Sequence, residues 1–155
     1  MITAWRITKT TDMRKAFSGE GSRLYGGRWN SKGIAVDYAA ATRSLAMLEI
    51  LVHMRNTQQT VPPIPYMLFP ASFDERLIEE LPPSSLPPDW DLEPPSDLTK
   101  SIGDAWVYAA SSPVLSVPSV IVPEERNYIL NPGHALFGQI RFGSPVPCKF
   151  DPRLL

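Results

Sequence analysis

Hydrophobic positions in the first third of the chain follow the periods of two strands and one helix. Apolar side chains alternate with polar or small ones over residues 2–8 (ITAWRIT) and 33–40 (GIAVDYAA), which is the two-residue period of a strand. Thr42 or Ser44 can then cap a helix that runs to about Arg55. This helix is apolar on nearly all sides, so we expect it to be buried.

Short apolar segments separated by turn-forming residues make up the rest of the chain. The pattern predicts strands over residues 66–69, 114–117, 120–122, 127–130 and 135–142. It predicts helical segments over residues 12–17, 73–81 and 98–110, and a turn over 131–134. Gly103 lies inside the 98–110 helix, where glycine costs about 1 kcal/mol relative to alanine, so we expect close packing there.

Prolines are concentrated in the second half of the sequence. The chain has 17 of them, well above the usual share of about 5%. The connection over about 81–96 is interrupted too often for regular structure. It can be a polyproline ligand for another domain, or an ordered connection with Leu86 and Trp90 tucked against the core. We favour the second, since neither half carries a complete set of elements on its own.

The composition fits a soluble protein with one domain, residues 1–155, and a proper core. A net charge of −1 gives no basic field for nucleic acid. No apolar run approaches the roughly 20 residues that span a membrane, and the N-terminus lacks a signal-peptide pattern, so a cytoplasmic location is expected. The single cysteine, Cys148, excludes an internal disulfide and a CxxC metal site.

A glycine-rich loop over residues 17–33 carries the first candidate chemistry. Its glycines allow another molecule to approach the backbone closely, and they surround Arg28, whose planar guanidinium suits phosphate or carboxylate. The spacing matches neither a P-loop nor a dinucleotide fingerprint. From these residues we expect an anion-recognition element, although Arg28 can instead tie the loop to a carbonyl group or to Asp37.

Glu49 is the second candidate, because it lies in the middle of the apolar helix. A buried charged carboxylate costs several kcal/mol, roughly, unless it has a partner or a function. It can be the structural ion-pair partner of Arg28, or a functional acid. A zinc site built from Glu49, His53 and His134 is conceivable but not favoured, because the HExxH pattern is absent.

Several segments together resemble the RES domain family, named for its arginine, glutamate and serine. They are FSGEGSRLYGGRWNSKG (17–33), the strand ending at Tyr38, LAMLEILVH (45–53) and VPSVIVPEERNYILNP (117–132), and the resemblance extends from WRI to NPGH over nearly the whole chain. It implies an α+β, ADP-ribosyltransferase-like fold, which we expect to be a single compact domain with a twisted, mainly antiparallel two-sheet core and flanking helices. It also implies a toxin of a toxin–antitoxin pair that consumes NAD⁺, with a cognate Xre-type helix-turn-helix antitoxin as its partner.

The resemblance assigns roles to particular side chains. It implies that Arg28, Glu49, Tyr38 and Ser119 are catalytic residues. It implies that Arg6, Arg28, Tyr38, Ser119 and Asn127 bind the cofactor NAD⁺. From the residues alone, a surface arginine is the usual interpretation of Arg6 and a turn hydroxyl that of Ser119, while Tyr38 can be an ordinary core tyrosine. A serine-hydrolase site is disfavoured, because no GxSxG elbow is present.

Cleavage of the nicotinamide N-glycosidic bond of NAD⁺ is the activity we expect. The ribose develops positive charge in such a reaction, which a carboxylate such as Glu49 stabilises. Water or inorganic phosphate as co-substrate would receive the ADP-ribose, and no metal is required. The alternatives are ADP-ribosylation of a protein target and a non-catalytic binding module. A homodimer is compatible with the sequence, and neither direct nucleic-acid binding nor a membrane is expected.

Overall fold

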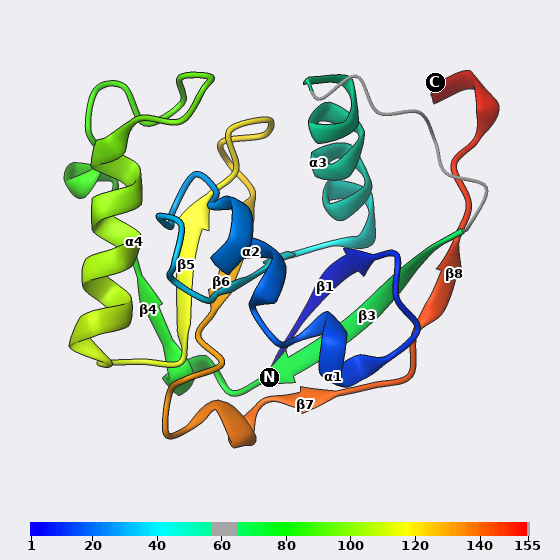
Figure 1. The fold of residues 1–155 in the computed structure, drawn as a ribbon, viewed down its shortest axis with the longest axis horizontal. Helices are drawn as coiled ribbons and strands as arrows, with labels where there is room; N and C mark the ends of the chain where they lie inside the picture. The colour runs from blue at the N-terminus through cyan, green and yellow to red at the C-terminus, as the bar shows by residue number, and fades with distance from the viewer. Residues whose placement is uncertain (57–64, 155) are drawn as a thin grey trace.

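A computed structural model describes residues 1–56 and 65–154, and in these residues eight strands form one strongly curled sheet (Figure 1). The strand order is β4-β5-β6-β2-β1-β3-β7, and β8 also pairs with β3. The strands are β1 (Ile2–Thr8), β2 (Asp37–Ala40), β3 (Tyr66–Phe73), β4 (Ile78–Glu80), β5 (Val114–Pro118), β6 (Arg126–Leu130), β7 (Arg141–Phe142) and β8 (Val146–Cys148). Only the β4–β5 pair is parallel.

The α+β class is confirmed, but the predicted two-sheet core is wrong. Strand β2 pairs with β1 on one side and with β6 on the other, so it joins the two halves into a single sheet. The sheet is curled, and different helices cover its two faces. This four-residue strand therefore joins the β4-β5-β6 part of the sheet to the part formed by β1, β3, β7 and β8.

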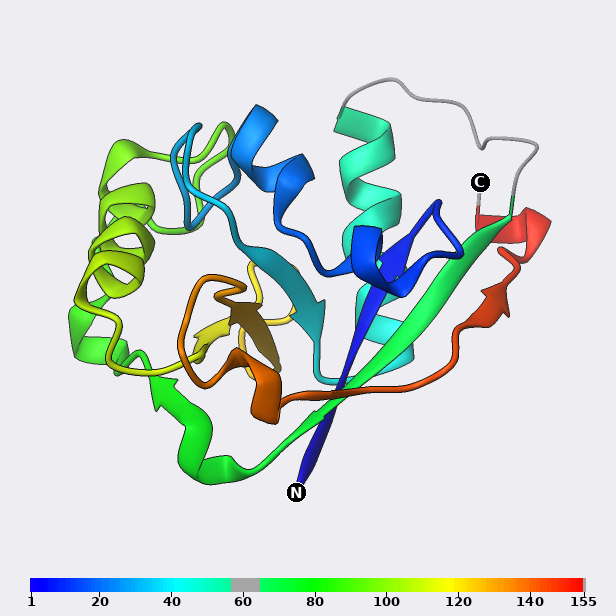
Figure 2. The ribbon, with the colours of Figure 1, turned by 60° about the horizontal axis from the view of Figure 1, so that its bottom comes forward.

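Helices cover the two faces of the sheet unequally. They are α1 (Met13–Ala16), α2 (Glu20–Tyr25), α3 (Arg43–Asn56) and α4 (Asp97–Ala109). On one face, Ala40 packs with α3 residues, while Tyr38 packs with Trp106 of α4. On the other face, Ala16 and its neighbours pack against Ala39 and the aromatic residues of β3. Figure 2 shows α1 and α3 on opposite sides of β1 and β3.

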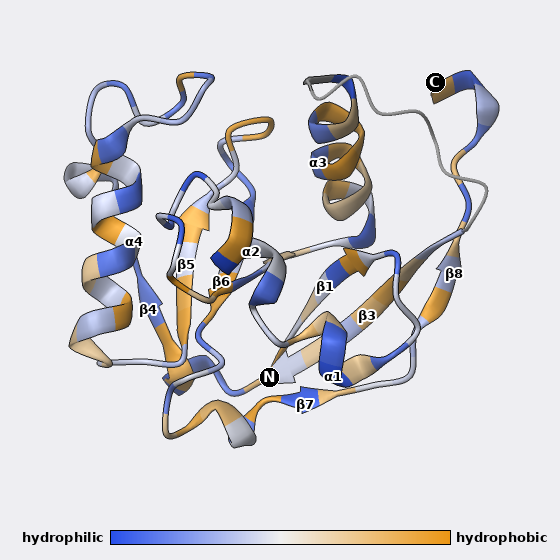
Figure 3. Ribbon diagram, viewed as in Figure 1, coloured by the Kyte–Doolittle hydropathy of each residue, from blue (hydrophilic) through white to orange (hydrophobic). Residues whose placement is uncertain are grey.

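Helix α3 is buried along one side only, contrary to the prediction. Leu45, Leu51 and Met54 are buried against the sheet, but Leu48 and Val52 are 39% and 41% exposed. The sheet covers a single side of the helix, so apolar residues on its other side face solvent. Figure 3 shows the contrast with β5, which is hydrophobic over most of its length and buried at every position.

Other predicted elements are confirmed, among them the helical segment over 12–17, which is α1, and the turn over 131–134. Strands were predicted over 2–8, 66–69, 114–117 and 127–130, and they fall in β1, β3, β5 and β6. The helix predicted over 98–110 is α4. The strand predicted over 33–40 begins only at Asp37.

Three predicted elements are wrong, each for a local reason. Residues 73–81 contain a 3₁₀ turn (Glu75–Leu77) followed by β4, because pairing with β5 outweighs the helical pattern. Residues 120–122 form a turn whose amides bind the Ser119 hydroxyl. Residues 135–142 contain a 3₁₀ turn (Phe137–Gln139), and only β7 pairs in this segment. Helix α2 and strand β8 had no clear sequence signal.

The glycine-rich loop packs tightly against α4, which confirms the expectation for Gly103. A Cβ atom at Gly103 would lie 1.6 Å from the Trp29 carbonyl oxygen. One residue along α4, the Asp104 carboxylate accepts hydrogen bonds from the backbone amide and the hydroxyl of Ser31 at 2.9 and 2.6 Å. Leu86 and Trp90 also pack against this part of the core, so the proline-rich segment is an ordered connection.

Candidate functional site

Glu49 lies within hydrogen-bond distance of two other residues implied by the resemblance. The Ser119 hydroxyl donates to Oε1 of Glu49 at 2.8 Å, and the Asn127 side-chain amide donates to the same oxygen at 2.7 Å. Arg28 pairs with Glu93 instead, at 2.9 Å. The hypothesis that Glu49 is the ion-pair partner of Arg28 is therefore wrong, and its partners are neutral.

The strand register and one turn explain why these side chains converge. Asn127 pairs with Ala40, the last residue of β2, and α3 begins three residues later. Ser119 follows β5 directly, in the turn that leads to β6. Its hydroxyl oxygen accepts the amides of Ile121 and Val122 at 3.1 and 3.2 Å, which leaves its one hydrogen for Glu49.

The Glu49 carboxylate is anchored through one oxygen. Both donors bind Oε1, and Oε2 accepts no hydrogen bond from residues 1–56 or 65–154. The Asn127 side-chain oxygen is also buried without a partner in this part of the chain. A buried polar atom without a partner is costly, so the Asn127 oxygen marks a position next to the Glu49 carboxylate where a ligand hydroxyl or a water molecule can bind.

Tyr38 lies on the same face of the sheet as Asn127, as a diagonal neighbour across the β2–β6 pair. Its hydroxyl donates to the Asn30 side-chain oxygen at 2.6 Å and accepts the Trp29 amide at 3.0 Å. Burial raises the pKa of Tyr38 well above its usual range, so the phenol stays protonated. In this arrangement Tyr38 fixes the end of the glycine-rich loop next to Arg28.

Arg28 is held by the proline-rich connection. Its Nη1 donates to the carbonyl oxygens of Trp90 and Leu92 at 3.1 and 2.7 Å, and its Nη2 contacts the Glu93 carboxylate. The alternative in which Arg28 ties the loop to carbonyl groups is thus confirmed, and the one involving Asp37 is wrong. Nothing in the sequence pattern singled out Glu93, which is one of three acidic residues in the proline-rich connection.

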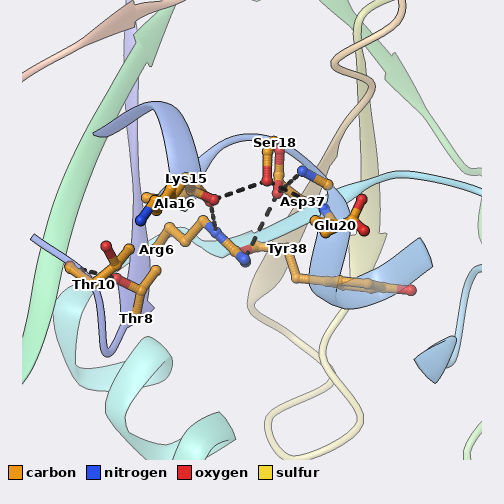
Figure 4. Close-up of polar contacts among 10 residues, drawn as sticks. Arg6, Thr8, Thr10, Lys15, Ala16, Ser18, Glu20, Asp37 and Tyr38 are labelled. Carbon is orange, nitrogen blue, oxygen red and sulfur yellow. Dashed lines mark hydrogen bonds and ion pairs between the residues drawn. The ribbon is translucent and has the colours of Figure 1, made fainter. Parts of the chain in front are cut away.

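Arg6 and Asp37 form a second polar cluster (Figure 4). Arg6 donates from Nε to the Ala16 carbonyl and from Nη1 to the Tyr38 carbonyl, and its Nη2 lies 3.7 Å from Oδ1 of Asp37. The same Asp37 oxygen accepts the Gly19 amide at 2.9 Å. These contacts tie α1 and the start of α2 to β2.

This second cluster lies on the other face of the sheet from Glu49. Trp5 pairs with Ala40 and packs on the α3 side, and Arg6, the next residue, points the opposite way. Figure 4 shows the Tyr38 ring extending away from the Arg6 guanidinium. The structure therefore brings Glu49, Ser119 and Asn127 together with Tyr38 nearby, and places Arg6 behind them.

Burial controls the protonation of Asp37. It raises the pKa of Asp37 to about 6, although Arg6 and the Gly19 amide act in the opposite direction. The second oxygen, Oδ2, is buried without a hydrogen-bond partner among the described residues. This pair could not be predicted from the sequence, because Arg6 and Asp37 are separated by 31 positions and meet only through the sheet register.

Neither a metal site nor a membrane helix is found in the described residues. No three His, Cys, Asp or Glu side chains there are grouped for metal binding. His134 accepts the Leu136 amide at Nδ1, and its Nε2 lies 2.8 Å from the Ala110 carbonyl. No helix in residues 1–56 or 65–154 has the length and apolar character needed to cross a bilayer.

Comparison with known proteins gives the family. The model described as the RES domain matches residues 3–151, and the chain belongs to this family. "Toxin Res" of Yersinia enterocolitica serotype O:8 / biotype 1B is 38% identical over 151 residues, which cover 97% of each chain. "Prs ADP-ribosylating toxin" of Sphingobium sp. (strain YBL2) is 37% identical over 155 residues, covering 97% of this chain and 95% of that one.

A solved structure shares the fold. A chain in the crystal structure of the M. tuberculosis MbcT–MbcA toxin–antitoxin complex superposes with a TM-score of 0.77 and 21% sequence identity. The match covers 95% of this chain and 84% of that one. At this level of identity the likeness extends to the fold, and the chemistry has to be argued from the side chains described above.

Proposed function

We propose that this protein is a toxin that destroys NAD⁺ by cleaving its nicotinamide N-glycosidic bond. The observation that carries the proposal is the Glu49 carboxylate, which is fixed at Oε1 by Ser119 and Asn127 while Oε2 is not engaged by described residues. Membership of the RES family and the names of its relatives support a toxin that uses NAD⁺.

The chemistry follows from charge. Nicotinamide in NAD⁺ is cationic, so the C1′–N bond breaks with both electrons going to a neutral leaving group. The ribose acquires oxocarbenium character, and a carboxylate beside it stabilises this charge more in the transition state than in the ground state. An oxygen of water or inorganic phosphate then bonds to C1′, and its proton passes to solvent. Hydrolysis and phosphorolysis use the same donor site.

The other residues serve Glu49 or the dinucleotide. Ser119 and Asn127 orient the carboxylate and bind a ribose hydroxyl, Arg28 contacts a phosphate group of NAD⁺ or inorganic phosphate, and Tyr38 holds the loop and stacks on the nicotinamide or ribose. The predicted cofactor contact of Arg6 stays a prediction, because its present partners lie on the other face of the sheet. The scheme needs no metal.

The partner we propose is an Xre-type helix-turn-helix antitoxin that covers this site in the cytoplasm. The relatives named as toxins and the fold shared with a toxin–antitoxin complex support it. Leu48 and Val52, which flank Glu49 on α3 and are partly exposed, offer an apolar surface at the site for such a partner. Transfer of ADP-ribose to a protein is the second candidate, favoured by the name of the Sphingobium relative.

The test is NAD⁺ consumption by purified protein, with and without phosphate, beside Glu49→Gln. We expect this variant to lose activity by roughly 10²–10³-fold, the usual effect of removing one electrostatic contact to a transition state, with an unchanged melting temperature. Glu79→Gln is a matched control, since Glu79 also accepts a serine hydroxyl, from Ser111 at 2.9 Å, but lies on β4.

Each result has a distinct meaning. Phosphate dependence would name the acceptor, and label from NAD⁺ appearing on added protein would favour the second candidate. A Glu49→Gln variant that consumes NAD⁺ at the normal rate would exclude the role given to Glu49. If the unmodified protein neither consumes NAD⁺ nor transfers label, the remaining interpretation is a non-catalytic binding module.

A further inference from the structure

The guanidinium of Arg28 has two kinds of partner, both within the proline-rich connection. The carbonyl oxygens of Trp90 and Leu92 share Nη1, and the Glu93 carboxylate contacts Nη2. Figure 2 shows the loop that carries Arg28 running alongside this segment. The connection therefore supplies both neutral acceptors and one full negative charge to the same side chain.

The two kinds of partner differ in how firmly they are held. Backbone carbonyls in an ordered segment stay where the chain places them, and they orient a guanidinium that is only 15% exposed. Glu93 is 55% exposed and can turn away into solvent with little loss, because exposed ion pairs contribute little net stability. The carbonyls position Arg28, whereas the carboxylate is exchangeable.

We propose that Glu93 occupies the anion-binding position on Arg28 in the unliganded protein, and that a phosphate group of the substrate replaces it. The identity of this ligand rests on the proposed function. The geometry supports the exchange because a carboxylate and a phosphate make the same kind of contact with a guanidinium. Glu93 is thus a specificity-determining residue for the anionic part of the substrate.

The charge of a ligand decides how well it replaces Glu93 on Arg28. A ligand has to displace the carboxylate, and any carboxylate that stays nearby repels it. Two phosphates, as in pyrophosphate, compete with a single carboxylate better than one weakly charged group does. Removal of the Glu93 charge should therefore tighten the binding of phosphate-containing ligands and reduce the discrimination between mono- and multivalent anions.

Direct binding tests this without any turnover. Calorimetry would compare inorganic pyrophosphate and ADP-ribose binding to the unmodified protein, Glu93→Gln, Arg28→Lys and Arg28→Gln. Glu93→Gln should bind both probes about 1.5- to fivefold more tightly, the scale of a lost exposed ion pair. The double variant Arg28→Gln, Glu93→Gln should not show this gain in affinity, because the guanidinium is absent. Arg28→Lys should keep only part of the affinity of the unmodified protein for the two probes. Glu20→Gln, which removes an equally exposed partner of Arg23, is the matched control and should change nothing.

Unchanged or weaker binding by Glu93→Gln would overturn the proposal, because it would make Glu93 only a support for Arg28. If NAD⁺ is consumed, Glu93→Gln should also lower KM with kcat preserved, whereas a support would lower kcat. The binding arm stands even if no NAD⁺ is consumed. Failure of the anion exchange and failure of the proposed function are thus seen in different measurements.

Discussion

Strand β2 separates two carboxylates, Asp37 and Glu49, that have different partners and different exposure. On one face Asp37 is fully buried beside a cation, Arg6, and receives the Gly19 amide. On the other face Glu49 is partly exposed, and within residues 1–56 and 65–154 it receives only neutral donors, from Ser119 and Asn127. Asp37 is thus already paired with a cation, whereas the hydrogen-bond donors to Glu49 bring no positive charge that would compete with a substrate cation.

The comparison also explains why buried acids need not be functional. Both carboxylates have an oxygen without a hydrogen bond from the described residues, so this feature does not distinguish them. The two carboxylates are distinguished by their exposure to solvent and by the charge of their neighbours. Asp37 and Arg6 hold α1 and the start of α2 against the sheet. These contacts offset the free-energy cost of burying the two charges. Among the residues that the structure describes, the Glu49 carboxylate accepts hydrogen bonds only from the Ser119 hydroxyl and the Asn127 side-chain amide.

The largest effect we expect is on stability, from Arg6→Met. This change leaves the Asp37 charge buried without its cation, and breaking a buried pair in this way typically costs about 3–5 kcal/mol. Urea unfolding at pH 7.5 would measure it, and Arg6→Met combined with Asp37→Asn should recover part of the loss. A variant of unchanged stability with a raised KM for NAD⁺ would instead support a cofactor contact for Arg6.

The pH dependence of stability provides a second and smaller test. The pKa of Asp37 is about 6 in the folded chain against an ordinary value of 3.8, so the folded chain holds an extra proton between these pH values. Raising the pH through this window therefore lowers the free energy of unfolding, by up to about 3 kcal/mol in total. Below pH 4 this loss is absent.

Asp37→Asn isolates this contribution, because it cannot titrate but keeps an oxygen for the Gly19 amide. The difference in unfolding free energy between Asp37→Asn and the unmodified protein should shift in favour of the variant as the pH rises from 4 to 7. Urea titrations at several pH values would measure it. A difference that stays constant across the window would mean that Asp37 titrates at its ordinary pKa.

The sequence allowed the Glu49 side of this comparison to be predicted, but not the Asp37 side. Glu49 stood out because a carboxylate in an apolar helix is anomalous. The family resemblance supplied Ser119, and Asn127 was added to complete the hydrogen bonding. Arg6 and Asp37 lie in unremarkable strands, and only the register of β1 against β2 brings them together. The same limit applied to Glu93, whose contact with Arg28 spans 65 positions.

Elements were predicted well where local periodicity and tertiary pairing agree, as in β1 and α4. They were predicted badly where a side chain redirects the backbone. The Ser119 hydroxyl binds two amides and turns an apolar, strand-like segment into the loop that carries it to Glu49. The prediction of a strand over 120–122 thus failed next to the candidate site, where local preference is overridden by the site's geometry.

The smallest effects should come from Ser119→Ala and Asn127→Ala. Each removes one of two donors to the same oxygen, a hydrogen bond to a charged group worth about 1.5–3 kcal/mol, so kcat for NAD⁺ consumption should fall roughly 10–100-fold with little change in KM. Ser111→Ala, which removes the corresponding hydroxyl from Glu79, should leave kcat unchanged. Because the two donors share Oε1, either one alone still orients the carboxylate, and the double variant should lose more than the product of the single losses. A Ser119→Ala loss as large as that of Glu49→Gln would contradict an orienting role and place the hydroxyl itself among the reacting groups.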